Sequence, residues 1–118
     1  MPTDAEITAF LTDRVLGWVL TPQAEQAADP NLTWRDKEGW PKLTPDLKSW
    51  DGFGLLLTAV VTAGWRPEIS YETDSLKSWT VYLHADNDPD MYTFEGIDPD
   101  LCSALRLAVA RAYGMEGL

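Results

Sequence analysis

The chain has 118 residues, of which 45% are hydrophobic and 11% aromatic, and it carries a formal net charge of -10 with a pI near 4.3. This length and composition predict one compact domain, residues 1–118, and exclude a disordered chain. The negative charge argues against direct binding to nucleic acid or to an anionic membrane, because both would repel the protein, and it permits a basic protein partner.

The amino-terminal segment predicts a helix followed by a short strand. Thr3 and Glu6 are spaced as a capping box, in which each side chain accepts a hydrogen bond from the backbone of the other. The apolar stripe that follows predicts a helix over residues 4–16, ended by Gly17. Residues 18–20, Trp-Val-Leu, form a candidate strand.

A loop and a small hairpin come next. Residues 21–31 are polar and bounded by prolines, which is typical of a surface loop. Residues 32–42 predict a hairpin in which Trp34 and Trp40 flank the polar turn Asp-Lys-Glu-Gly. Pro41 confines the second strand of this hairpin to an edge of its sheet, since proline lacks the N–H that a central strand needs.

The longest apolar stretch predicts a central helix over residues 46–63, capped by Thr44 and ended by Gly64. Gly52 and Gly54 lie inside it, where they permit either close packing or the approach of a ligand to the backbone. A helix this apolar is normally covered on two sides, so we expect another element behind it. Its expected core face comprises Trp50, Phe53, Leu57, Val60 and Val61.

Three strands and a helix complete the chain. Alternating apolar and polar residues predict strands at 65–73, 78–85 and 91–95, arranged as an antiparallel meander. Asp98 is the expected cap of the last helix, which Gly114 ends. The order helix, strand, hairpin, helix, three strands, helix predicts an α/β (α+β) fold, a small layered sandwich with helices packed on an antiparallel sheet.

The densest charged feature lies between residues 86 and 100, where acids occur without any lysine or arginine. The run resembles the start of a calcium loop, but Met91 stands where the loop needs glycine and Ile97 where it needs glutamate, so we predict no metal site. The acids form either an ordinary polar turn and helix cap, or a binding surface that imitates nucleic-acid phosphates. The residues of this candidate surface are Asp86, Asp88, Asp90, Glu95, Asp98 and Asp100.

No catalytic set stands out. His84 is the only histidine, so it cannot form a typical zinc site, and the sequence identifies no partner for general base catalysis. The single cysteine, Cys102, lies among leucine and alanine and is expected to be a buried thiol. There is no phosphate loop and no nucleophile elbow. We therefore predict a protein that is not an enzyme and needs no cofactor.

Six tryptophans are many for this length. Trp50, Trp65 and Trp79 fit the expected core. Trp34 and Trp40 lie on a hairpin that is too small to bury both easily, which makes them candidates for an aromatic protein interface. The alternative is that each packs within the protein.

The order of elements resembles the phage ABA sandwich domain family of small phage and prophage proteins. The resemblance lies in "TDRVLGWVL", "TWRDKEGW", "TPDLKSWDGFGLLLTAVVTAGW", "EISYETDSLKSWTVYLHADND" and "DLCSALRLAVARAYG", which together cover nearly the whole chain. It implies a layered fold with helices on both faces of a sheet, and no catalytic residues.

The leading functional hypothesis is therefore a non-catalytic phage or prophage accessory protein that binds a protein. In its most concrete form the acidic surface occupies a basic site on a nucleic-acid-handling host protein, as an anti-defence inhibitor would. The alternatives are a small-ligand binder, with Tyr82, His84 and Arg66 in a pocket between sheet and helix, and an enzyme that uses His84 with a nearby carboxylate.

The chain shows no secretory signal and no membrane-spanning run, so we expect it in the cytoplasm. The sequence leaves the partner and the oligomeric state open.

Overall fold

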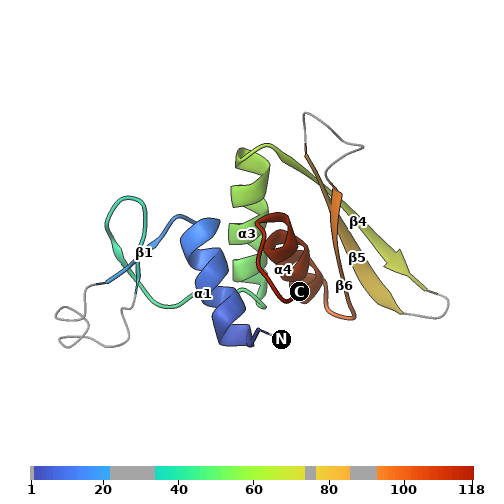
Figure 1. Cartoon of the computed structure of the whole chain (residues 1–118), viewed down its shortest axis with the longest axis horizontal. Coiled ribbons are helices and arrows are strands. Elements are labelled where there is room, and N and C mark those ends of the chain that lie inside the picture. Colours follow the sequence, from blue (N-terminus) through green and yellow to red (C-terminus); the bar gives the residue numbers. More distant parts are fainter. Residues whose placement is uncertain (1, 22–33, 74–76, 86–92) are drawn as a thin grey trace.

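The computed structural model describes residues 2–21, 34–73, 77–85 and 93–118 (Figure 1). Within them it contains three helices and two antiparallel three-stranded sheets, which confirms the predicted order and fold class. The elements are α1 (Asp4–Arg14), β1 (Val19–Leu20), β2 (Trp34–Arg35), β3 (Pro41–Lys42), α3 (Trp50–Thr62), β4 (Trp65–Glu72), β5 (Ser78–Ala85), β6 (Thr93–Asp98) and α4 (Leu101–Ala112).

The helices lie between the two sheets (Figure 1). Strands β1, β2 and β3 form a small sheet at one end, and we call this sheet, with the turn 36–40 between β2 and β3 and the following Leu43, the arm. Strands β4, β5 and β6, the main sheet, lie at the other end. All three helices of the described part of the chain lie on one side of the main sheet, whereas the resemblance implied helices on both faces.

The sheet pattern explains why its other face is not covered by these helices. Along β5, Val81 and Leu83 are fully buried on the inner face, while Thr80, Tyr82 and His84 alternate with them on the outer face. A strand with one apolar and one polar face is typical of an antiparallel sheet that meets solvent on one side.

A close backbone contact joins β6 to α4. A Cβ on Gly96 would collide with the carbonyl oxygen of Ala104 and would lie 2.6 Å from the backbone nitrogen of Ala108. Glycine at this position therefore lets the backbone of α4 rest directly on β6. Val81 and Leu83 of the neighbouring strand β5 and Leu105 and Val109 of α4 belong to the same buried core cluster.

The start of α1 agrees with the sequence. The Thr3 hydroxyl accepts the Glu6 N–H at 3.1 Å, and the Glu6 carboxylate accepts the Thr3 N–H at 3.4 Å, which confirms the capping box. The helix ends at Arg14, two residues earlier than predicted, and Leu16 turns into the core.

The predicted start of α3 is wrong. The helix begins at Trp50, and Ser49 caps it by accepting the Gly52 N–H at 3.2 Å. Leu47 is buried in the core, and the turn that buries it takes the chain out of the helical path. A Cβ on Gly52 would collide with the carbonyl oxygen of Asp46, so the packing interpretation holds for this glycine, whereas Gly54 meets nothing within 4 Å.

The predicted core face of α3 is also partly wrong. Trp50 is 69% exposed and Val61 is exposed, while Leu56 and Val60 are fully buried. Because the helix starts later, Trp50 occupies its first turn and projects beyond the core. Leu55 is exposed as well, so this apolar helix is not covered on two sides by the described residues.

The cap of the last helix lies two residues after the predicted cap, Asp98. Asp100 caps α4 by accepting the Ser103 N–H at 2.9 Å. Asp98 instead accepts the Asp100 N–H at 2.9 Å and fixes the turn between β6 and the helix. Two acids of the predicted surface therefore have defined structural contacts.

Candidate interaction surfaces

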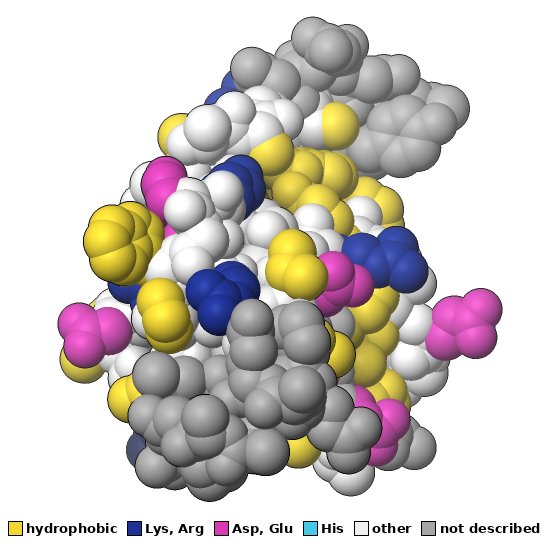
Figure 2. All heavy atoms as spheres, turned by 90° about the vertical axis from the view of Figure 1, so that its left-hand side faces the viewer, with side chains coloured by type: hydrophobic (Ala, Val, Ile, Leu, Met, Phe, Trp, Pro, Cys, Tyr) yellow, Lys and Arg dark blue, Asp and Glu magenta, His cyan; other side chains and the backbone are white. Residues whose placement is uncertain are grey.

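Four large apolar side chains of the arm are exposed. They are Val19, Leu20, Trp40 and Leu43, and Trp40 is 67% exposed. Figure 2 views the molecule from this end and shows hydrophobic side chains interspersed with acidic and basic ones. Apolar groups of this size exposed on a small element favour a contact with another molecule.

A network of hydrogen bonds holds Trp40 in place. The Asp36 carboxylate accepts the N–H groups of Glu38, at 3.0 Å, and Trp40, at 2.9 Å. Arg35 donates to the Gly39 carbonyl at 3.0 Å, and Gly39 has a φ of 86°, which glycine adopts without strain. The predicted hairpin is therefore confirmed, and its turn is closed by its own side chains.

The two tryptophans of the arm differ. The prediction of Trp34 as an exposed interface residue is wrong, because Trp34 is only 4% exposed. It lies on β2, the middle strand of the arm, whereas Trp40 precedes the edge strand β3. Trp40 alone of this pair is available to a partner.

The described acids of the predicted surface do not form one cluster, since Asp98 and Asp100 are in contact but Glu95 lies apart from them on the sheet. Glu95 lies exposed on the outer face of the main sheet, in register with Tyr82. Asp98 is the last residue of β6, and it pairs with Trp79 near the start of β5. Asp86, Asp88 and Asp90 lie outside the described residues.

His84 takes part in a row across the outer face. Its Nε2 lies 2.9 Å from a carboxylate oxygen of Glu68, and its Nδ1 lies 3.0 Å from the Thr93 hydroxyl. Carboxylate, imidazole and hydroxyl in this order can move a proton. The row lies on a sheet surface, however, and it lines neither the pocket of about 450 Å³ nor the pocket of about 900 Å³ found among the described residues.

The residues proposed for a small-ligand pocket lie elsewhere than predicted. Arg66, Tyr82 and His84 all lie on the outer face of the main sheet, with Arg66 and His84 directly paired across β4 and β5. They therefore cannot line a cavity between this sheet and the helices. That version of the ligand hypothesis is wrong.

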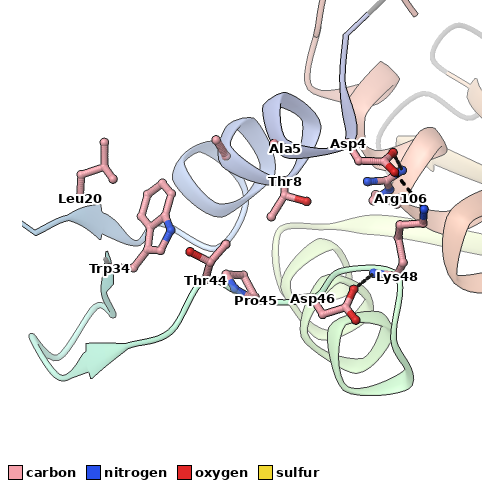
Figure 3. A pocket seen from close by; sticks show the side chains of 11 residues that line it. Asp4, Ala5, Thr8, Leu20, Trp34, Thr44, Pro45, Asp46, Lys48 and Arg106 are labelled. Atoms are coloured by element: carbon pink, nitrogen blue, oxygen red, sulfur yellow. Dashed lines mark hydrogen bonds and ion pairs between the residues drawn. The ribbon is translucent and has the colours of Figure 1, made fainter. Parts of the chain in front are cut away.

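A different pocket opens where the arm meets the helices (Figure 3). It has a volume of about 450 Å³, and α1, the arm, the segment before α3 and α4 all contribute to it. Its charged end holds Asp4, Lys48 and Arg106, while Trp34, Leu20 and Pro45 lie toward the other end (Figure 3).

One carboxylate organises the charged end. Arg106 Nη2 donates to Asp4 Oδ1 at 2.7 Å, and Lys48 Nζ donates to Asp4 Oδ2 at 3.0 Å. The hydrogen bonds from Arg106 and then Lys48 lower the pKa of Asp4 to about 2. Arg106 Nη1 is buried and has no hydrogen-bond partner among the described residues.

The sequence of α4 contains a signal for this buried arginine. Arg106 lies four residues after Cys102 and four before Ala110, and all three are buried on α4. This spacing places the three residues on one face of the helix. An arginine on the same helix face as a cysteine and an alanine is expected to be buried, and a buried cation needs a partner of opposite charge.

The structure also bears on the cysteine, on the possible metal ligands and on the possible membrane-spanning helices. Cys102 is a free, buried thiol as predicted, and burial raises its pKa. In the part of the chain that the structure describes, no three His, Cys, Asp or Glu side chains gather as a metal site. None of its helices has the length and apolar character to cross a membrane.

Comparison of the chain with protein-family models, with curated proteins and with solved structures finds no match.

Proposed function

We propose that this protein acts by binding another protein, without catalysis, and that the arm makes the central contact. The observation that carries the proposal is Trp40, whose side chain is 67% exposed although the Asp36 turn fixes its backbone. A large aromatic side chain held on an ordered element loses little conformational entropy on binding, so it is a favourable anchor for an interface.

The charge of the molecule indicates the character of the partner. The net charge is -10, and the segments 22–33, 74–76 and 86–92 contain six acids and no lysine or arginine. Acidic surfaces attract a basic partner and accelerate its association, and this attraction weakens with salt. The arm itself has both signs of charge, so its contribution to the complex is apolar contact.

The family resemblance supports a more specific form of the proposal. In this form the protein is a phage or prophage accessory factor in the host cytoplasm that occupies a basic site of a nucleic-acid-handling defence protein. Asp86, Asp88, Asp90 and Glu95 would imitate phosphates there. Asp98 and Asp100 contribute less, because each accepts a backbone hydrogen bond at the start of α4.

Affinity capture from a host lysate tests the proposal. Three baits are compared: the unchanged protein, Trp40→Ala and Trp50→Ala. Trp50 is the matched control, because its side chain is 69% exposed but lies on α3 and not on the arm. We expect a protein retained by the unchanged bait and by Trp50→Ala, and lost with Trp40→Ala. Retention of the same proteins by all three baits would reject the role of the arm.

The electrostatic part needs its own test. Replacing Asp86, Asp88 and Asp90 together by asparagine removes three charges without shortening a side chain. We expect slower association with the captured partner and a weaker dependence of that rate on salt. An unchanged association rate at low salt would remove these acids from the proposal while leaving the arm contact in place.

A further inference from the structure

The pocket between the arm and the helices has the composition of a small-ligand site. Its volume of about 450 Å³ falls in the range of about 300–1,000 Å³ that is usual for ligand pockets. Most of its lining is apolar, with Trp34, Leu20 and Pro45 away from the charged end (Figure 3). Such pockets bind an apolar body and orient it through a few polar groups.

The charged end contains hydrogen-bond donors that have no acceptor among the described residues. The Lys48 ammonium has three N–H donors and uses one on Asp4, as far as the described residues show. Arg106 is only 7% exposed, and its Nη1 has no partner in the described part of the chain. Asp46, the second acid of the pocket, accepts the backbone N–H of Lys48 at 3.1 Å.

An unpaired nitrogen on a buried guanidinium is costly, because it has lost water without gaining an acceptor. Arg106 reaches the pocket from α4 at the end where Lys48 also lies (Figure 3). An acceptor that enters this end would therefore meet the Lys48 ammonium, whose donors are not all used, close to the buried Arg106 guanidinium. A carboxylate has two oxygens in one plane and can accept from both.

We propose that this pocket binds a carboxylate attached to an apolar group, with the carboxylate on Lys48 and Arg106 and the apolar group against Trp34 and Pro45. A dianionic phosphate fits less well, because Asp4 and Asp46 also line the pocket and would repel it. A small organic acid and the carboxyl terminus of a peptide with an apolar last residue share the required chemistry. The inference can be tested separately from the proposed protein contact, because Trp40 does not line the pocket, although Leu20 of the arm does.

Nuclear magnetic resonance titration tests this site. The ¹⁵N-labelled protein is titrated with 4-phenylbutyrate and, as its neutral counterpart, with 4-phenylbutyramide. A second pair of probes is the peptide Ala-Ala-Phe with a free or an amidated carboxyl terminus. The reporters are the indole N–H of Trp34, assigned with Trp34→Phe, and the backbone amide of Thr8, which also lines the pocket.

We expect saturable shifts of both reporters with at least one acid and none with the neutral probes. Tighter binding of 4-phenylbutyrate would identify a small organic acid as the ligand, and tighter binding of the free peptide would identify the carboxyl terminus of a chain. Lys48→Gln should weaken binding about tenfold through loss of one charge-assisted hydrogen bond. Lys42→Gln should leave it unchanged, and Lys42 is a matched control because both lysine side chains are 46% exposed.

Two kinds of result would overturn the site. The first kind is equal affinity for the acid and for its amide, or equal affinity of the unchanged protein and of Lys48→Gln for the acid. Either result shows that the cations do not recognise the carboxylate. The second kind is the absence of shifts at both reporters with every acid up to about 10 mM, the weak limit of specific binding. Trp40→Ala should bind the probes normally, so a failure here and a failure of the arm contact are distinguishable.

Discussion

Arg106 donates to Asp4 at 2.7 Å, and this bond joins the middle of α4 to the first turn of α1 across 102 positions of the sequence. Lys48 donates to the other oxygen of the same carboxylate at 3.0 Å. One acidic side chain thus connects the two terminal helices with the segment that precedes α3. The carboxylate also lies in the first turn of α1, where negative charge suits the helix dipole.

Replacing Asp4 by asparagine should lower the thermal stability at neutral pH. The substitution removes the ionised acceptor of both cations and leaves the buried Arg106 guanidinium without its charged partner. Because the pKa of Asp4 is lowered to about 2, its ionised form stabilises the fold above the ordinary pKa near 3.8, and this contribution is lost as the pH falls through about 2.

Thermal melts of both proteins between neutral pH and pH 2 measure this effect. The difference between their melting temperatures should have its largest value above pH 4 and should become smaller toward pH 2. Asp13→Asn is the control, since Asp13 contacts only Arg14 at 3.5 Å among the described residues and both side chains are exposed. A difference that does not change with pH would show that the ionisation of Asp4 does not stabilise the fold.

Replacing Gly96 by alanine should destabilise the protein by about 1–3 kcal/mol, the usual cost of overpacking. The added methyl group would collide with the backbone of α4, and neither strand nor helix backbone can move aside easily. Urea denaturation followed by circular dichroism measures the free energy of unfolding.

Gly54→Ala provides the contrast, because Gly54 lies within α3 and its added methyl group meets nothing within 4 Å. It should stabilise the protein by about 0.5–1 kcal/mol through helix propensity. Equal effects of the two substitutions would mean that α4 does not rest on β6 as described.

The thiol of Cys102 should react with Ellman's reagent on the order of 100-fold more slowly in the native protein than in the denatured one, since buried groups react through opening of the fold. Burial removes the thiol from the reagent and raises its pKa, which reduces the thiolate form that reacts. The absorbance of the released thiolate follows the reaction. Equally fast labelling of both states would place Cys102 at the surface.

Local signals in the sequence predicted much of the fold. Three confirmed features depend on residues that are close in the chain: the capping box of Thr3 and Glu6, the hairpin around Gly39 and the alternation along β5. Such features can be predicted because the interacting groups are neighbours.

The start of α3 could not be predicted in this way. Thr44, Pro45 and Asp46 form a favourable helix start, but burial of Leu47 and the close contact of Gly52 with Asp46 favour a cap at Ser49 and a start at Trp50. These are tertiary contacts, and they outweigh local propensity. The exposure of Trp50 follows from the same shift.

The pocket could be predicted least. Its charged end combines Asp4, Lys48 and Arg106, which are far apart in the sequence and meet only after the helices pack. The spacing of Cys102, Arg106 and Ala110 could have identified a buried arginine. It could not have identified the partner of that arginine.

The affinity of the captured partner for the protein and for Trp40→Ala, measured by isothermal titration calorimetry, tests the central claim most directly, with Trp50→Ala as the control. Loss of a central aromatic anchor costs about 2 kcal/mol or more, so Trp40→Ala should weaken binding by about 30-fold, while Trp50→Ala binds as the unchanged protein does. Equal dissociation constants for all three proteins would contradict the account.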